Sequence, residues 1–189
     1  MISGLEVPLL MITKACLCAA WDDVPTRKPA RCSILPGNQV AADECCAGQA
    51  WVRWVRTFLS TVDTFPAAAG QQITRGQAGC AELFWAVDMS VGVMRCVPSA
   101  GEIEMAGSFS PPKAVDLEAA TLSFMDDVHR VRAAMACCLD ASIAANQTAH
   151  NWGETSLFLG QADPTGPQGG CVAFEMQVVV GVFSCPCLP

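Results

Sequence analysis

Apolar residues alternate with smaller or polar ones in two stretches of the chain, as in strands that pack one face on a core. In residues 82–97 the apolar positions are Leu83, Trp85, Val87, Met89, Val91 and Val93. In residues 171–183 they are Val172, Phe174, Met176, Val178, Val180 and Val182. Residues 49–60 are rich in aromatic and β-branched residues, and 152–160 is expected to form a hairpin with 171–183. The pattern therefore predicts four main strands.

Two other stretches place apolar residues three and four positions apart, the spacing of one face of a helix. The stripe in residues 114–140 consists of Leu117, Thr121, Phe124, Val128, Val131, Met135 and Cys138. The stripe near the N-terminus consists of Leu5, Leu9, Ile12, Cys16 and Ala19. A pair of prolines at 111–112 precedes the longer stripe and is typical of a helix start. These patterns predict one long helix and one N-terminal helix.

Turn-forming residues separate these elements. Residues 22–50 are expected to hold two short strands or loops pinned by cysteines, and 162–170 is expected to be a hairpin connection. Long loops are predicted at about 61–80 and 98–113. The order of elements predicts an α+β fold in a single domain spanning 1–189. Its sheet is expected to be mostly antiparallel and four-stranded, with the long helix and the N-terminal helix packed on one face.

Composition excludes several classes of protein. The chain has 189 residues, of which 52% are hydrophobic and 15% charged, so it is too apolar for intrinsic disorder. Its formal net charge of −7 argues against a protein that grips nucleic acid through the phosphates. The longest apolar runs are far shorter than the roughly 20 residues that cross a bilayer. The apolar start lacks the basic residues of a secretory signal, so we expect neither secretion nor a membrane partner.

Catalytic chemistry is not expected. The chain has two histidines and no tyrosine, and no catalytic or cofactor-binding residue set is predicted. His129 lies off the apolar stripe of its helix and is expected at the surface, whereas His150 is expected in a loop. The glycine pair at 169–170 is not followed by the lysine and helix of a phosphate-binding loop. We therefore expect a protein that is not an enzyme and binds no cofactor.

Twelve cysteines leave three alternatives open. Free buried thiols are the default in a reducing cytosol, and disulfides would form later, after release into an oxidising medium. Zinc is the third alternative, although the close cysteine pairs lack the C-x2–4-C spacing of zinc sites. The candidates for a disulfide or a weak zinc site are Cys16, Cys18, Cys32, Cys45, Cys46, Cys185 and Cys187.

Four segments resemble neck proteins of long-tailed actinobacterial phages. They are residues 45–53 (CCAGQAWVR), 85–96 (WAVDMSVGVMRC), 135–138 (MACC) and 166–172 (GPQGGCV). The order of elements is similar to that of phage tail terminator proteins. This resemblance implies a structural virion protein that forms a ring, usually a hexamer, at the head-proximal end of the tail tube. Such a ring ends tail polymerisation and joins the tail to the head connector.

The resemblance also implies the partners and the location of the protein. The partners are further copies of the chain, the tail tube protein and the connector or stopper protein, and DNA passes through the lumen without specific binding. The protein would be made in the host cytoplasm and reside in the virion neck. The expected subunit contacts are Arg53 and Arg56 in the strand, Phe65 and Arg75 in the first loop, and Glu102 and Glu104 in the second.

Two alternative functions remain open at this point. The first is a head–tail connector or stopper ring, one position closer to the head. A stopper is usually a small β-barrel, and the long helix over 114–140 argues against it. The second is a cytosolic, cysteine-rich metal-binding protein, which the absence of a C-x-x-C motif disfavours. Oligomerisation separates both ring proteins from the metal-binding alternative.

Overall fold

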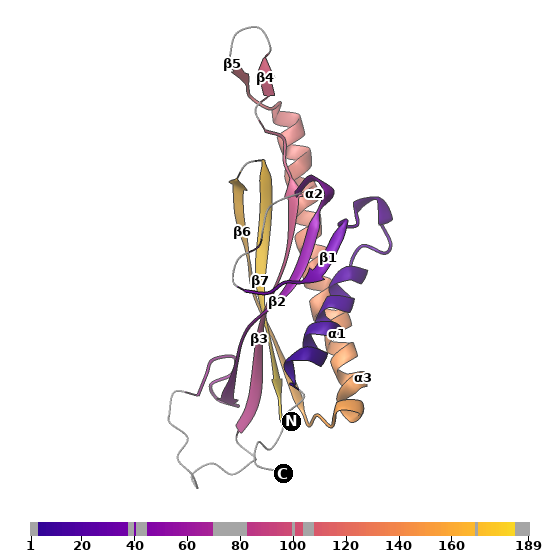
Figure 1. Ribbon diagram of the computed structural model, residues 1–189, viewed down its shortest axis with the longest axis vertical. Helices are drawn as coiled ribbons and strands as arrows, with labels where there is room; N and C mark the ends of the chain where they lie inside the picture. Colours follow the sequence, from indigo (N-terminus) through magenta and orange to yellow (C-terminus); the bar gives the residue numbers. More distant parts are fainter. Residues whose placement is uncertain are drawn as a thin grey trace.

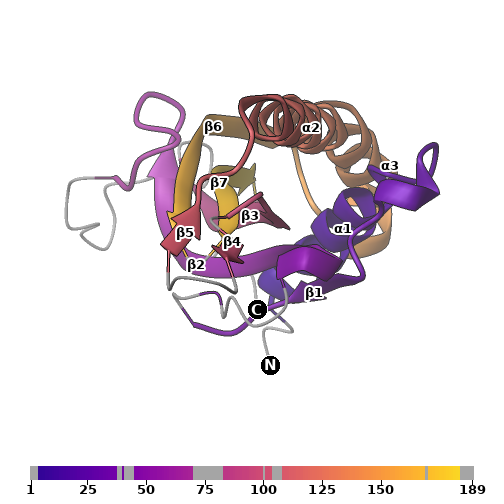
Figure 2. The same cartoon turned by 90° about the horizontal axis from the view of Figure 1, so that it is seen from above.

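A computed structural model describes residues 4–37, 40, 45–69, 83–99, 101–103, 108–168 and 170–183. The main sheet has the strand order β1-β2-β3-β7-β6, and helices cover one of its faces (Figures 1 and 2). Its strands are β1 (Arg31–Ile34), β2 (Gln49–Thr61), β3 (Leu83–Cys96), β6 (Thr155–Gln168) and β7 (Cys171–Val182). No helix among the described residues is long and apolar enough to cross a membrane.

The predicted α+β fold is present, but the prediction of a four-stranded antiparallel sheet is wrong in detail. A fifth strand, β1, pairs with the start of β2 in parallel, so the sheet is mixed. The four predicted strands all form, and their mutual pairings are antiparallel. The segment β1 is four residues long, too short to show a periodicity, and it is among the short elements expected between residues 22 and 50.

The helical layer consists of α1 (Glu6–Ala19) and one continuous helical rod. The rod comprises α2 (Ala114–Ala133), the π-helical segment η3 (Ala134–Leu139) and α3 (Asp140–His150). The rod extends ten residues beyond the predicted end at 140. The apolar stripe did not predict these last turns, because they are rich in alanine and only Ile143 of α3 is buried. Asn151, with φ of 53°, ends it in the left-handed conformation.

Smaller elements correct three further predictions. The expected loop 98–113 contains a hairpin of β4 (Gly101–Ile103) and β5 (Ser108–Ser110). The expected connection 162–170 is mostly strand, because β6 runs to Gln168 through two register shifts. His150 lies in the last helical turn and stacks on Trp152, with ring centroids 4.8 Å apart, rather than in a loop. Two 3-10 segments, η1 (Pro25–Arg27) and η2 (Cys45–Ala47), lie in the turn-rich region.

The core lies between the helices and one face of the sheet. The predicted apolar positions of β3 and β7 that point to this face, from Val87 to Val93 and from Phe174 to Val182, are buried. They pack with Leu9 and Leu17 of α1 and with Met135 of η3. Burial of such side chains contributes about 1.5–3 kcal/mol each, so this apolar layer is the main source of stability.

A buried carboxylate ties three segments to this core. Asp127 of α2 accepts hydrogen bonds from Trp21 Nε1 at 2.7 Å, Arg27 Nη2 at 2.9 Å and Arg95 Nε at 2.8 Å. Its side chain is 1% exposed. The three donors come from the turn after α1, from η1 and from β3. The carboxylate therefore fixes the position of α2 relative to both the sheet and the α1–β1 connection.

We expect Asp127→Ala to lower the free energy of unfolding by about 3 kcal/mol, because two guanidinium groups lose their buried counter-charge. Urea or guanidinium denaturation, followed by tryptophan fluorescence, measures the change. The matched control is Asp22→Ala, whose partner Lys28 is exposed, and its cost is expected to stay within about 1 kcal/mol. Equal losses in the two variants would contradict the central role of Asp127.

Candidate functional site

Disulfides join most of the candidate cysteines. The four bridges are Cys16–Cys138, Cys18–Cys32, Cys45–Cys171 and Cys46–Cys96. The default expectation of free thiols is therefore wrong for these eight residues, and the disulfide alternative is present. Cys137 is exposed and has no bridge among the described residues. Cys185 and Cys187 lie outside the described residues.

The adjacent pair Cys45 and Cys46 connects η2 to two neighbouring strands at one end of the sheet. Their partners Cys171 and Cys96 lie opposite each other in the β3–β7 ladder. The adjacent cysteines therefore link η2 covalently to both β3 and β7. With these sulfurs in bridges, they are not metal ligands in this structure. Within the described ranges, no three His, Cys, Asp or Glu side chains group as a metal site.

The second face of the sheet carries paired charges. Arg53 binds Glu175, with Nε and Nη2 at 2.8 and 2.7 Å from Oε1, and Trp51 Nε1 donates to the same oxygen. Next to them, Arg56 Nε lies 3.0 Å from the buried carboxylate of Asp88. The two predicted contact arginines therefore lie on one strand and are each engaged within the chain. Arg56 remains largely exposed at its outer end.

The other predicted contact residues lie apart from this pair. Phe65 is half-buried and packs against Phe84, with ring centroids 5.4 Å apart. Glu102 lies in β4 of the small hairpin. Arg75 and Glu104 lie outside the described residues. The described parts of the two loops, at 61–69 and at the β4–β5 hairpin, are found at opposite ends of the molecule (Figure 1).

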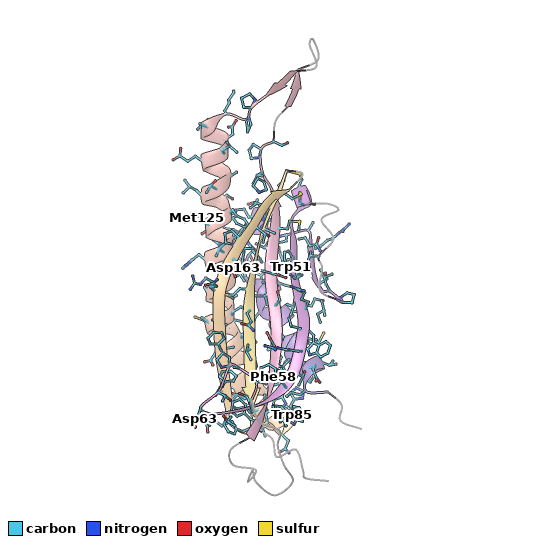
Figure 3. The ribbon with its side chains drawn as sticks, turned by 90° about the vertical axis from the view of Figure 1, so that its left-hand side faces the viewer. Trp51, Phe58, Asp63, Trp85, Met125 and Asp163 are labelled. Carbon is cyan, nitrogen blue, oxygen red and sulfur yellow. A yellow bond between two sulfur atoms is a disulfide. The ribbon has the colours of Figure 1, made fainter. Side chains whose placement is uncertain are left out.

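The first half of α2 runs past the end of the sheet toward the β4–β5 hairpin (Figures 1 and 3). Of the predicted stripe, Phe124, Val131 and Met135 are buried, whereas Leu117 and Thr121 are exposed. Residues 114–125 of α2 expose four large apolar side chains, namely Val115, Leu117, Leu122 and Met125, of which Met125 lies beside the sheet rather than beyond its end (Figure 3). The apolar stripe did not predict that its first positions are exposed, because burial along α2 depends on where the sheet ends and not on the helical period.

An apolar groove of about 420 Å³ separates this helix from the end of the β6–β7 hairpin. Its walls are formed by Phe124, Met125 and Val128 of α2 and by Pro164 and Phe174 of the strands, among other residues. Met125, which is 62% exposed, lies at its edge. The groove and the projecting helix together form one apolar surface near one end of the molecule.

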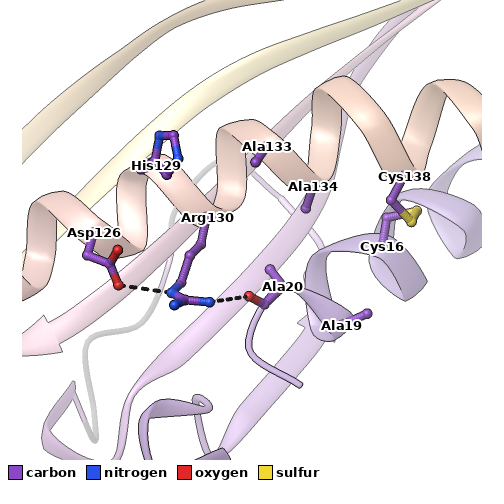
Figure 4. Close-up of a pocket in the computed structure, with 9 residues that line it drawn as sticks. All are labelled: Cys16, Ala19, Ala20, Asp126, His129, Arg130, Ala133, Ala134 and Cys138. Carbon is purple, nitrogen blue, oxygen red and sulfur yellow. Dashed lines mark hydrogen bonds and ion pairs between the residues drawn. A yellow bond between two sulfur atoms is a disulfide. The ribbon is translucent and has the colours of Figure 1, made fainter. Parts of the chain in front are cut away.

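A second groove, also of about 420 Å³, lies between α1 and the helical rod, and four of its nine lining residues are alanine (Figure 4). Arg130 binds Asp126 at 2.9 Å and Asp23 at 2.7 Å at one end of this groove. The hydrogen bonds from Arg130 lower the pKa of both carboxyl groups. The predicted surface residue His129 is exposed at the same groove. The cluster holds α2 against the end of α1.

Comparison with known proteins identifies no relative: no protein family and no curated protein matches the sequence. The site is therefore defined by geometry alone. It consists of the projecting apolar half of α2, the adjacent groove and the charged second face of the sheet. These are features of a surface that contacts other macromolecules, and exposed apolar patches of this kind mark such contacts.

The disulfides predict a measurable loss of stability. We expect the double variant Cys16→Ala, Cys138→Ala to lose about 2–4 kcal/mol of unfolding free energy, because this bridge closes a long loop. Denaturation without reductant measures the loss, and Cys137→Ala is the matched control, expected to be neutral. The oxidised chain should also be lighter by two hydrogens for each bridge. The intact mass of a fully reduced chain would contradict the assignment.

The Arg130 cluster predicts a pH effect. Because folding lowers the pKa of Asp23 and Asp126, their contribution is present at neutral pH and is lost as the pH falls below the ordinary value of 3.8. In Arg130→Met both pKa values should rise, which carboxyl NMR titration measures. Arg132→Met, exposed on the same helix, is the control. Unchanged titration of Asp23 in Arg130→Met would show that the ion pair does not form in solution.

Proposed function

We propose that the chain is a structural subunit of a ring at the head-proximal end of a phage tail tube. In this function it ends polymerisation of the tube and joins it to the head connector. The observation that carries the proposal is the half of α2 that projects past the sheet with its apolar side chains exposed. A free protein gains nothing from exposing such a surface, whereas a subunit covers it against a neighbour.

The direction of the projection supports an axial contact. The first turns of α2 and the β4–β5 hairpin extend together along the longest axis of the molecule, beyond one end of the sheet (Figure 1). A ring that joins two other rings needs a surface of this kind along its axis. Val115, Leu117 and Leu122 supply the apolar part of that contact, and the groove beside α2, with Met125 at its edge, enlarges it.

The charge of the chain supports a ring that surrounds DNA without binding it. The formal net charge is −7, and the arginines on the second face of the sheet, Arg53 and Arg56, are paired with carboxylates of the same chain. Such a wall repels phosphates, so DNA slides past without adhering. The disulfides would suit a mature particle outside the host, where thiols oxidise.

We expect Leu122→Asp with Met125→Asp to abolish termination. Both side chains are exposed, so the variant should fold, while a charged pair on an apolar contact opposes docking. The assay adds the chain to polymerising tail tube protein and measures tube length by electron microscopy. The matched control, Ala144→Asp, changes an exposed residue of α3 and should shorten tubes like the wild type.

The same assay separates the alternatives. Wild-type protein that binds filled heads but not tubes would assign the chain to the connector or stopper ring instead. Wild-type protein that binds neither, and leaves tube length unchanged, would refute a neck function. Full activity of the Leu122→Asp, Met125→Asp variant would show that the tube contacts another surface.

A further inference from the structure

The main sheet has two open edges, one on each side. At the first, β1 pairs with Gln49–Val52 alone, and the backbone N–H of Ala69 binds the carbonyl of Leu59. Among the described residues, the stretch of β2 from 53 to 58 has no strand partner on its outer side, although the Thr57 hydroxyl donates to Glu6 of α1 at 2.8 Å. At the other edge, β6 is the last strand of the sheet. Unpaired strand edges are templates for pairing with another chain.

The two open edges lie at the same level of the sheet. Trp54 pairs with Met89 of β3, which pairs with Val178 of β7. Val178 in turn pairs with Leu159 of β6. Trp54 and Leu159 are therefore the two ends of a single row across four strands. Lower in the sheet, Leu59 and Thr155 end another row in the same way.

The strand directions also match. Each pair along β2, β3, β7 and β6 is antiparallel, so β6 runs antiparallel to β2. If a second copy is placed beside the first in the same orientation, its β2 edge meets the β6 edge of the first as an antiparallel pair. The matching rows allow antiparallel pairing on both sides of the bulge that β2 carries between Trp54 and Arg56.

The prolines that protect an edge are confined to the part of β6 that this pairing does not use. Pro164, Pro167 and two register shifts interrupt β6 beyond Leu159, and all of these features block pairing. From Thr155 to Leu159 the strand is regular and contains no proline. The open stretch of β2 exposes Trp54 and Val55 by 48% and 45%, with a bulge between Trp54 and Arg56.

We infer that copies of this chain join laterally through these edges, the open stretch of β2 in one copy pairing with Thr155–Leu159 of the next. The inference rests on the proposed ring and names its lateral contact. Such a contact is heterologous, using two different surfaces, and it generates a closed ring when the rotation closes. The sheet then continues from copy to copy, which satisfies both edges.

Side chains at the matching rows fit one another. Trp54 of one copy lies beside Leu159 of the next, which covers the exposed indole with an apolar neighbour. Arg56 shares a row with Asp88, Val179 and Phe158. Its guanidinium, which lies 4.8 Å from the ring centroid of Phe58 in the same chain, would then also lie beside the Phe158 ring of the neighbour, in reach of a second cation–π contact.

The test uses two single variants of the full chain, Trp54→Lys and Leu159→Lys. Each places a charge in one edge and leaves the other edge intact. Sedimentation velocity and native mass spectrometry of the oxidised protein should show a wild-type ring. Each variant alone should lose the ring, with a dissociation constant weakened at least about tenfold by a buried lysine. Ala144→Lys, on α3, is the matched control and should keep the ring.

A mixture of the two variants is decisive. The intact β2 edge of Leu159→Lys can pair with the intact β6 edge of Trp54→Lys, and the remaining edges both carry lysine. The mixture should therefore give dimers that grow no further, whereas the double variant should stay monomeric. Thermal unfolding of each variant monitors folding, and Trp54→Phe, which keeps an apolar ring, should retain assembly.

The outcomes separate this inference from the proposed function. Rings in both lysine variants, or a mixture without dimers from folded chains, would overturn edge pairing while leaving tube termination intact. A wild-type chain that stays monomeric at the highest concentration would also overturn it. If the wild-type protein forms rings that the lysine substitutions disrupt but does not terminate tubes, the neck function is refuted and the lateral contact stands.

Discussion

The carboxylate of Asp127 is the constraint on which the arrangement of the helices depends. It is buried, and it is satisfied only while Trp21, Arg27 and Arg95 all reach it from separate segments. An ionised group in such a place is tolerated because three charged or polar donors replace its water. These hydrogen bonds fix the position of α2 along β3. That position decides which turns of α2 cover the sheet and which project beyond it, so the buried ion cluster determines which apolar side chains are exposed.

The disulfides covalently link elements that the packing of the apolar core has already placed side by side. Cys16–Cys138 joins the two helices that pack on the sheet, and the bridges of Cys45 and Cys46 join η2 to two strands. Three of the four bridges link residues at least 50 positions apart, so they act on the whole fold rather than on local turns. The bridges therefore stabilise the fold as a whole, because cross-links restrict the unfolded state.

Periodicity predicted the elements that bury one face over many residues, and it failed where burial is short or decided by distant residues. The strands β3 and β7 follow their alternation closely, whereas β1 is four residues long and α3 buries Ile143 alone. The disulfide pairing could not be predicted, since partners such as Cys45 and Cys171 are brought together by the β3–β7 register. Arg53 and Arg56 were predicted as a pair, but their carboxylate partners lie on strands far along the chain.

The two surfaces of the proposed ring subunit point in different directions. The projecting half of α2 exposes large apolar side chains and points along the long axis, where the proposed contact with the tail tube would form. The sheet edges point sideways and offer backbone groups, whose pairing depends on register more than on side chains. The prolines of β6 begin where its row partners on β2 are already paired with β1, so the half of β6 that prolines protect lies level with the half of β2 that β1 covers. That coincidence is expected if one contact shaped both edges, because an edge needs protection wherever no partner covers it.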